Sequence, residues 1–429
     1  MSPVSEKEGV KELQAVVDRM NGTIAKLKAR GALQSEICFW EAQRNYYQRA
    51  HEANVAGDPL FLTGYFIPQE LLHAMDIAIL SAENHGIQSV QSVPFEEAEP
   101  LFDAAEGYGM SNEVCSPHRA AMGLALAGVM PRPTATFATA TTCDQTLKLY
   151  EVLADYYKIP NFSLDSPYRI DQRGIDYAKE DMKAMIRFAE EHSGRKLDWD
   201  RLREVLRLSR QTYDYWEQIC AMRKAVPCPT GGRASVKDFA ILLSNCGRIE
   251  ALRYYQARYE EMKGVLDSGR GVIPEERHRV AWLYVLPLFD LRIADWLEQE
   301  HQAVVVMDTF GYANPEIELD PEDPLDFLAK KALKWGFIQQ TYAPNAESGF
   351  ARKMARQCVD YKADVAVVLA HWSCNQYCGT IRLLKDEVSE KLGIPFLVLD
   401  GDILDPRVVS AAQMRAKFDE FFAMVEGQR

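Results

Sequence analysis

The sequence lacks the features that mark membrane proteins and nucleic-acid-binding proteins. None of its apolar runs approaches the roughly 18 residues that a membrane-spanning helix needs, and its polar, charged start does not resemble a secretory signal. Lysine and arginine form no run longer than two residues, and the formal net charge is −13, whereas a nucleic-acid-binding protein usually carries a basic patch. We therefore expect a cytoplasmic protein that binds neither a membrane nor a nucleic acid.

Two common phosphate-binding motifs are absent as well. The sequence contains neither G-x-G-x-x-G nor a Walker A motif, so nothing in it independently indicates a dinucleotide or a nucleoside triphosphate. What is present is typical of a globular protein, because 47% of the 429 residues are hydrophobic and 26% are charged. That length exceeds what one hydrophobic core usually serves, so we expect two or three domains.

Hydrophobic periodicity divides the chain into four parts. A helical N-terminal segment comes first, and strand-like segments then alternate with helices, which predicts parallel sheets with right-handed crossovers. We expect an α/β protein with two Rossmann-like parallel-sheet domains, a helical N-terminal segment and a helical insert. The four parts are residues 1–57 (helical), 58–168 (first α/β domain), 169–276 (helical bridging segment) and 277–429 (second α/β domain). The expected strands are residues 59–66, 134–140, 159–165, 278–286, 303–310, 364–370 and 394–400.

The nine cysteines are the residues whose positions say most about function. Disulfides are rare in the cytoplasm, so we expect thiols that are either buried or bound to a ligand. Cys38, Cys220 and Cys358 fall among apolar residues of predicted helices, where cysteine usually acts as a small buried hydrophobe. Cys228 and Cys246 lie near loops or a helix end and show no ligand pattern, so we assign them a structural role by default.

Cys115, Cys143 and Cys374 share a different position, at a predicted turn between a strand and a helix. In an open parallel sheet, ligands bind in the crevice beyond the carboxyl ends of the strands. A helix N-terminus also favours a thiolate, because its N–H groups and its dipole point there. Ser116 and Asp144 are the expected N-caps of the helices that follow the first two cysteines. One cysteine at such a turn is usually structural, but three predict a shared ligand.

The spacing of these thiols bears on which ligand they share. Structural zinc sites use close C-x2–4-C pairs, and a thioredoxin-like redox pair needs C-x-x-C, which is absent here. Only Cys374 and Cys378 are close together, four residues apart on one face of a helix. Thiolates from separate turns suit an iron–sulfur cluster, whose ligands need only converge in space. Cys378 is the candidate for a fourth ligand.

Several motifs resemble those of the benzoyl-CoA reductase/2-hydroxyacyl-CoA dehydratase family. They are NEVCSPHRAAMG, TTCDQTLKLYE, HWSCNQYCG and the C-terminal LDGDILDPRVVSAAQMRAKFDEFFAMV. The earlier segment GYFIPQELLHAMD is similar to the G-x-x-x-P-x-E-L segment of that family. The resemblance extends from about residue 60 to the C-terminus and keeps the order of the motifs.

This resemblance implies the iron–sulfur, alpha-type subunit of an anaerobic 2-hydroxyacyl-CoA dehydratase, a lyase that works as a heterodimer with a homologous second (beta) subunit. It implies an oxygen-sensitive [4Fe–4S] cluster, with Cys115, Cys143 and Cys374 as its ligands. A separate ATP-hydrolysing iron–sulfur activator delivers one electron, and a ketyl radical of the acyl-CoA substrate then expels its hydroxyl to give an enoyl-CoA. Three cysteine ligands leave one iron open for the substrate. If Cys378 were a fourth ligand, the cluster would only relay electrons.

Two other functions stay open. The same family includes benzoyl-CoA-type aryl-CoA reductases, which use the same parts to reduce an aromatic ring. A homodimeric double-cubane-cluster protein would instead transfer electrons without a CoA substrate. That second alternative needs more ligand cysteines than the three thiols at predicted turns and Cys378 supply. The sequence does not indicate the acyl group of the substrate.

Three polar residues near these motifs are candidates for catalysis. His371 and Ser373 precede Cys374, where either one could hydrogen-bond a substrate or a cluster sulfur and so tune its reduction potential. Glu70 lies in the first turn of a helix that we expect over residues 68–86. The alternative for Glu70 is a role at the helix dipole, and for the other two it is that of a cap or a solvated loop residue.

Overall fold

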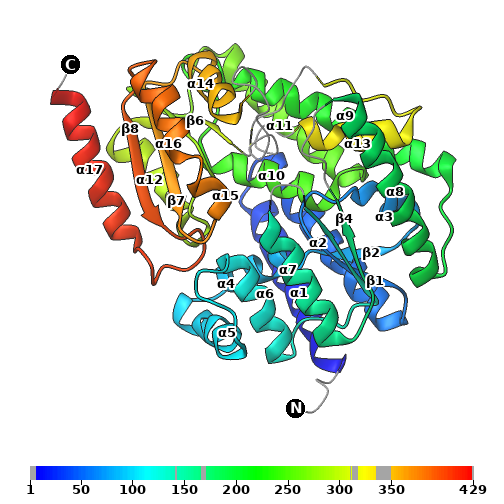
Figure 1. Ribbon diagram of the computed structural model, residues 1–429. Coiled ribbons are helices and arrows are strands. Elements are labelled where there is room, and N and C mark those ends of the chain that lie inside the picture. Colours follow the sequence, from blue (N-terminus) through cyan, green and yellow to red (C-terminus); the bar gives the residue numbers. More distant parts are fainter. Residues whose placement is uncertain are drawn as a thin grey trace. The chain divides into compact units, whose positions relative to one another are not determined.

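The computed structural model describes residues 6–140, 143–165, 171–309, 311, 317–334 and 349–427 (Figure 1). Two long helices, α1 (Glu6–Ala29) and α2 (Gln34–Ala56), come first and pack against each other. Buried residues recur along α1 at helical spacing, as in Leu13, Val16, Val17 and Met20. Gly57 ends α2 with a φ of 72°, a left-handed conformation that glycine adopts without strain. The helical N-terminal segment is therefore as expected.

The first sheet contains four parallel strands, β1 (Leu60–Thr63), β2 (Ala78–Leu80), β3 (Ala135–Thr139) and β4 (Asn161–Leu164). Their order in the sheet is β2-β1-β3-β4. Every residue of β1 and β3 is buried, as in parallel sheets that are covered on both faces. The helices between these strands are α3 (Gln69–Ala74), α4 (Ala82–Gln91), α5 (Phe95–Tyr108), α6 (Ser116–Ala127) and α7 (Asp144–Tyr157).

The single helix predicted over residues 68–86 is wrong, because α3, β2 and α4 occupy this stretch. Asp76, after α3, has a φ of 57°, a left-handed conformation through which an α-helix does not continue. Ser81 then caps α4, since its hydroxyl accepts a hydrogen bond from a backbone N–H (3.1 Å). Residues 78–80 between them pair with β1. Tertiary pairing therefore overrides the local helical pattern.

A helical segment follows the first sheet, as the sequence predicts. It comprises α8 (Gln172–Ser193), α9 (Trp199–Met222), α10 (Arg233–Asn245) and α11 (Ile249–Asp267). Asp171 caps α8 by accepting a hydrogen bond from the Gly174 N–H (3.0 Å). Within the described part of the chain, no strand interrupts these helices.

The second sheet repeats the strand order of the first. Its parallel strands β5 (His278–Trp282), β6 (Ala303–Asp308), β7 (Val365–His371) and β8 (Phe396–Gly401) have the order β6-β5-β7-β8. The helical elements in this part of the sequence are a 3-10 turn (Leu288–Asp290), α12 (Arg292–Glu300), α13 (Pro324–Lys334), α14 (Phe350–Asp360), α15 (Asn375–Cys378), α16 (Ile381–Lys385), a π-helical turn (Asp386–Glu390) and α17 (Ala411–Gly427). The last residue of the strand predicted over 303–310 lies outside the described residues.

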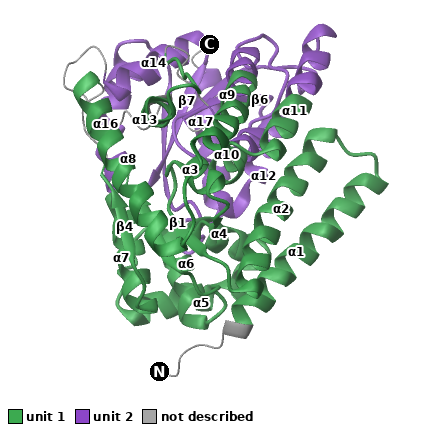
Figure 2. Ribbon diagram, turned by 90° about the vertical axis from the view of Figure 1, so that its right-hand side faces the viewer, with its two compact units in different colours: residues 1–215, 240–258, 316–334 green, residues 216–239, 259–315, 335–429 purple. Residues whose placement is uncertain are grey.

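The chain forms two compact units, shown in different colours in Figure 2. Unit 1 comprises residues 1–215, 240–258 and 316–334 and holds the first sheet. Unit 2 comprises residues 216–239, 259–315 and 335–429 and holds the second sheet. The expected α/β class with two parallel sheets, N-terminal helices and a helical insert is confirmed, whereas the four segment boundaries stay predictions. None of the described helices has the length and apolar character needed to cross a membrane.

The shared strand order gives each sheet one switch point. In both sheets the connection after the second strand returns to the far side of the first, so the order reverses between β1 and β3 and between β5 and β7. Ligands of open parallel sheets bind beyond the carboxyl ends of the strands at such a reversal. The residues that follow β3 and β7 are therefore well placed to hold a ligand, and they include Cys143 and Cys374.

Candidate functional site

Each of the three candidate cysteines is the N-cap of a helix. Cys115 precedes α6, Cys143 precedes α7 and Cys374 precedes α15. The N-caps predicted from the sequence, Ser116 and Asp144, are instead the first residues inside their helices. An N-cap lies beside the backbone N–H groups of the first turn that have no partner within the helix, and these groups stabilise a thiolate. The sequence-based N-caps were thus wrong by one residue, and the cysteines are closer to the helix ends than expected.

The strand-to-helix position predicted for Cys115 is wrong. Cys115 lies between α5 and α6, within the connection from β2 to β3. The residues before it form a turn rather than a strand, in which the Val114 N–H donates to the Ser111 carbonyl (3.0 Å). Cys143 and Cys374 do follow strands, and these are the equivalent strands β3 and β7 of the two sheets.

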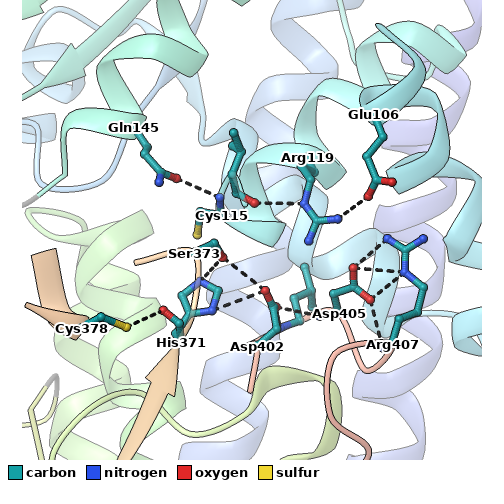
Figure 3. Close-up of polar contacts among 12 residues, drawn as sticks. Glu106, Cys115, Arg119, Gln145, His371, Ser373, Cys378, Asp402, Asp405 and Arg407 are labelled. Carbon is teal, nitrogen blue, oxygen red and sulfur yellow. Dashed lines mark hydrogen bonds and ion pairs between the residues drawn. The ribbon is translucent and has the colours of Figure 1, made fainter. Parts of the chain in front are cut away.

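In unit 1, the starts of α6 and α7 lie beside each other. The Cys115 N–H donates a hydrogen bond to the side-chain oxygen of Gln145, in the first turn of α7 (2.8 Å; Figure 3). Arg119, which is buried in α6, holds the preceding loop. Its Nε donates to the Val114 carbonyl (3.0 Å), and its Nη1 forms an ion pair with Glu106 (2.5 Å). These contacts fix the backbone at Cys115 relative to α7.

In unit 2, a closed turn joins the end of β7 to Cys374. The Cys374 N–H donates to the His371 carbonyl (2.7 Å), and the Cys378 thiol donates to the same carbonyl (3.2 Å; Figure 3). Burial, and next the nearby Cys374, raise the pKa of Cys378 to about 11. Cys378 is therefore a protonated thiol at neutral pH, and its hydrogen bond helps to close the turn that carries Cys374.

Asp402 connects the candidate residues His371 and Ser373 to the end of β8 (Figure 3). Its Oδ2 lies 3.4 Å from Nδ1 of His371 and accepts a hydrogen bond from the Ser373 hydroxyl (3.4 Å). The same hydroxyl lies 3.2 Å from Nε2 of His371, and all three residues are buried. Oδ1 of Asp402 accepts hydrogen bonds from the N–H groups of Leu404 (2.7 Å) and Asp405 (2.9 Å). Sequence reasoning missed Asp402, although its place two residues after the strand predicted over 394–400 was a usable signal.

Tyr377 anchors the short helix α15. A four-residue helix has little stability of its own, but the Tyr377 ring is buried against Tyr284, with 4.3 Å between ring centroids. Its hydroxyl contacts the Leu283 carbonyl and lies 3.3 Å from the Thr309 hydroxyl. Burial raises the pKa of Tyr377, so the phenol stays protonated. The helix turn that begins at Cys374 is therefore held by a side chain to which sequence reasoning gave no role.

Glu70 is fully buried in α3 of unit 1. Its Oε1 accepts a hydrogen bond from the Ser209 hydroxyl (2.7 Å), and its Oε2 forms an ion pair with Nζ of Lys331 (2.5 Å). Gly247 has a φ of 82°, and a Cβ there would lie 2.9 Å from Cγ of Glu70. The contacts of Glu70 that the structure shows hold α3 in place, and its contact with a substrate or a cluster stays a prediction.

The comparison with known families identifies the chain at the family level. The family model described as 2-hydroxyglutaryl-CoA dehydratase, D-component, matches residues 64–425. The chain belongs to this family. The match includes all four partly exposed cysteines, so the resemblance inferred from the motifs is confirmed.

The D-component relatives are subunits of both dehydratases and reductases. One benzoyl-CoA reductase subunit, from Thauera aromatica, is 26% identical over 89% of this chain and 92% of its own length. The (R)-phenyllactyl-CoA dehydratase alpha subunit of Clostridium sporogenes is 25% identical over 85% of this chain and 89% of its own. The alpha subunit of the (R)-2-hydroxyglutaryl-CoA dehydratase of Acidaminococcus fermentans is 26% identical over 67% of this chain and 59% of its own. These values do not separate the two kinds of enzyme.

Burial divides the nine cysteines of this D-component family member into two groups. Burial raises the pKa of Cys246 and Cys358 to about 12, so these thiols are protonated at neutral pH. Five cysteines are buried, namely Cys38, Cys220, Cys228, Cys246 and Cys358. Four are partly exposed, namely Cys115, Cys143, Cys374 and Cys378. The burial predicted for the three helix-interior cysteines is therefore confirmed.

The chemistry of the three N-cap cysteines fits an iron–sulfur cluster, the kind of cofactor for which the D-component family is known. Thiolates are the usual ligands of such clusters, and partial exposure at a helix N-terminus favours the thiolate form. Cys115 and Cys143 belong to unit 1, and Cys374 belongs to unit 2. Among the residues that the structure describes, no three His, Cys, Asp or Glu side chains form a ready metal site. Ligation of one cluster by all three cysteines is therefore a proposal.

Proposed function

We propose that this chain is the iron–sulfur subunit of a 2-hydroxyacyl-CoA dehydratase, with Cys115, Cys143 and Cys374 as ligands of a [4Fe–4S] cluster. The observation that carries the proposal is that these partly exposed cysteines each occupy the N-cap position of a helix, two of them at the switch points of parallel sheets. Relatives named as dehydratase alpha subunits support the class of reaction. In that reaction a 2-hydroxyacyl-CoA takes up one electron, loses water and returns the electron, so that the net change is elimination of water to give an enoyl-CoA.

The proposed division of labour gives the chemistry to the cofactor and the positioning to the protein. A cluster with one iron not bound by cysteine would act as a Lewis acid for the departing hydroxyl and would relay the electron. Gln145 and Arg119 fix the backbone around Cys115. Tyr377 does the same for the helix turn that begins at Cys374. A backbone held in this way would keep the cysteine thiolates in place when the oxidation state of the cluster changes.

His371, Ser373 and Glu70 are the proposed catalytic side chains. Contacts with Asp402 restrict the rotamers of His371 and Ser373 and hold both at the carboxyl end of β7. A hydrogen bond from either side chain to a cluster sulfur would change its reduction potential. Glu70 is paired with Lys331, so it would reach a substrate only by exchanging that ion pair.

Cys378 is proposed not to bind iron. Its thiol already donates to the His371 carbonyl, and this hydrogen bond closes the turn of Cys374 (3.2 Å). Three cysteine ligands would leave one iron of the cluster open to the substrate, the arrangement that catalytic metal sites use. Ligation by Cys378 would instead close that position and leave an electron relay.

The proposed enzyme has three protein components. Relatives named as subunits of dehydratases and of a benzoyl-CoA reductase support a homologous second (beta) subunit. The sequence has no Walker A motif, so we assign ATP hydrolysis and delivery of the electron to a separate iron–sulfur activator. The substrate is an acyl-CoA, and the cytoplasm stays the predicted location.

A subunit of a benzoyl-CoA-type aryl-CoA reductase is the second candidate function. The 26% identity to the benzoyl-CoA reductase subunit of Thauera aromatica, over 92% of that protein, favours it. A homodimeric double-cubane-cluster protein is less favoured. Such a protein needs more ligand cysteines than the four partly exposed ones. The other five cysteines are buried.

The test is turnover by the assembled enzyme under anaerobic conditions. The chain, its homologous subunit and the activator are supplied with ATP, a strong reductant and one of four thioesters, phenyllactyl-, lactoyl-, 2-hydroxyglutaryl- or benzoyl-CoA. Formation of an enoyl-CoA that depends on ATP supports the dehydratase, and reduction of the benzoyl ring supports the reductase instead. Turnover by this chain alone with a mild reductant would refute the mechanism. The matched control is the same assembly with Cys143→Ser.

A further inference from the structure

A buried polar cluster in unit 1 joins the two helices that begin at Cys115 and Cys143. His118 and Thr146 each follow one of these cysteines by three residues, so both lie in the first turn of their helices. Nε2 of His118 lies 3.5 Å from the Thr146 hydroxyl and 3.6 Å from Oε1 of Glu83. His118, Thr146 and Glu83 are all buried. Nε2 of His118 therefore lies close to a polar group of α7 and to one of α4.

Glu83 is held in place independently of His118. It lies in the first turn of α4, where a carboxylate is stabilised by the helix dipole. Its Oε2 accepts hydrogen bonds from the Tyr150 hydroxyl and from the Ser81 hydroxyl (3.2 Å). The Ala82 N–H in turn donates to the Tyr150 hydroxyl (3.1 Å). Oε1 of Glu83 has no hydrogen-bond partner among the described residues, and Nε2 of His118 lies 3.6 Å from it.

Helices α4 and α6 approach each other closely at a glycine. A Cβ at Gly86 would lie 2.9 Å from the Ala121 nitrogen and 3.1 Å from the Pro117 oxygen. The two helices therefore pack backbone to backbone near the start of α6. This approach brings Glu83, one turn earlier in α4, within reach of His118.

We propose that His118 is a positioning residue that sets the separation of Cys115 and Cys143. The bond from the Cys115 N–H to Gln145 is one point of contact between α6 and α7, and the contact from His118 to Thr146 is a second. Helix α6 is also packed on α4 and α5, and these two contacts join its first turn to the first turn of α7. The inference rests on the proposed function only in taking both cysteines as ligands of one cluster.

Cross-linking of the two thiols tests this inference without iron. The full chain, purified free of metal, is treated with dibromobimane, and the peptide that joins Cys115 to Cys143 is quantified by mass spectrometry. In His118→Gln the side-chain amide nitrogen lies where Nε2 of the histidine ring lies, so it can still contact Thr146. In His118→Asn the shorter side chain reaches only the position of Nδ1. We expect the yield to fall several-fold in His118→Asn and His118→Leu and to return close to the wild-type yield in His118→Gln.

The matched control is His85→Gln. His85 is also a buried histidine of unit 1, but the ring contact that it makes is with Tyr47, 5.7 Å between centroids. We expect this variant to keep the wild-type yield. Thermal unfolding of each variant confirms that the chain is folded. Should His118→Leu not fold, Thr146→Val removes the same contact with little change of shape and is expected to lower the yield as well.

Two results would overturn the inference. One is an unchanged yield in His118→Leu or, if that variant does not fold, in Thr146→Val. The other is an equal loss in His118→Gln and His118→Leu, which would show that only the volume of the ring matters. Iron measured on separately reconstituted wild-type protein tests the proposed function. If no cluster forms in that protein, the proposed function fails, but the cross-linking result for His118 still stands.

Discussion

Replacing Lys331 by methionine would isolate the charge of Glu70 inside unit 1. Both side chains are buried, with 2.5 Å between Nζ and Oε2, and methionine keeps the length of the lysine stem without its charge. The hydrogen bond from the Ser209 hydroxyl to Glu70 stays in place. Removing one partner of a buried ion pair costs about 3–5 kcal/mol. Each kcal/mol shifts the Tm of a domain of this size by about 2–4 °C, so we expect Tm to fall by about 6–20 °C.

Two further variants make this prediction decisive. Glu70→Gln combined with Lys331→Met leaves no charge buried alone, so we expect most of the lost stability to return. Lys183→Met removes an exposed ion pair to Glu180 (2.6 Å) and is expected to cost no more than about 1 kcal/mol. The assay is unfolding by heat and by guanidinium. A Lys331→Met loss no larger than that of Lys183→Met would refute the reasoning. Loss of turnover in the stable double variant would assign Glu70 a catalytic role as well.

The remaining predictions concern the cysteine turn and the response to acid. Cys374→Ser is expected to lose most of the iron and all activity, whereas Cys378→Ser is expected to keep the iron; equal loss would make Cys378 a fourth ligand. Cys358→Ser, in the interior of α14, is the control and is expected to cost about 1 kcal/mol of stability and no iron. Tyr377→Phe removes the hydroxyl that contacts the Leu283 carbonyl, so we expect a loss of about 1 kcal/mol and faster alkylation of Cys374 by iodoacetamide; an unchanged rate would deny the anchoring role. Burial lowers the pKa of His85 from 6.5 to about 4, so the unfolded chain binds more protons within that window. Stability is expected to fall as the pH drops from 6.5 to 4, by up to about 3 kcal/mol from this residue, and an equally steep fall in His85→Gln would contradict that assignment.

Local sequence pattern was sufficient for elements with a long or strongly apolar signal. The run of residues 364–370 predicted β7, and its buried, β-branched character left little alternative. The short strand β2 was missed because its three residues continue the helical pattern of α3 and α4. What decides its conformation is pairing with β1 and the left-handed Asp76, and neither is visible in a local window.

The candidate site was predictable only in part, because its supporting contacts join distant segments. Cysteine positions next to apolar runs indicated Cys143 and Cys374, which follow equivalent strands. For Cys115 the position between two helices was not foreseen, since no periodicity distinguishes the turn before it from a short strand. The partner of Glu70, Lys331, is 261 residues away, so only the fold shows that this carboxylate is already paired. Asp402 likewise acquires its place beside His371 through the pairing of β7 with β8.

Chemical analysis of iron and sulfide in the anaerobically purified chain tests the proposed cluster most directly. We predict about four irons and four sulfides per chain, the content of one [4Fe–4S] cluster. We also predict a broad visible absorbance that bleaches in air, and loss of the iron when Cys115, Cys143 or Cys374 is replaced by serine. Stoichiometric zinc without iron, or full iron content in those three variants, would contradict the assignment of these cysteines as ligands.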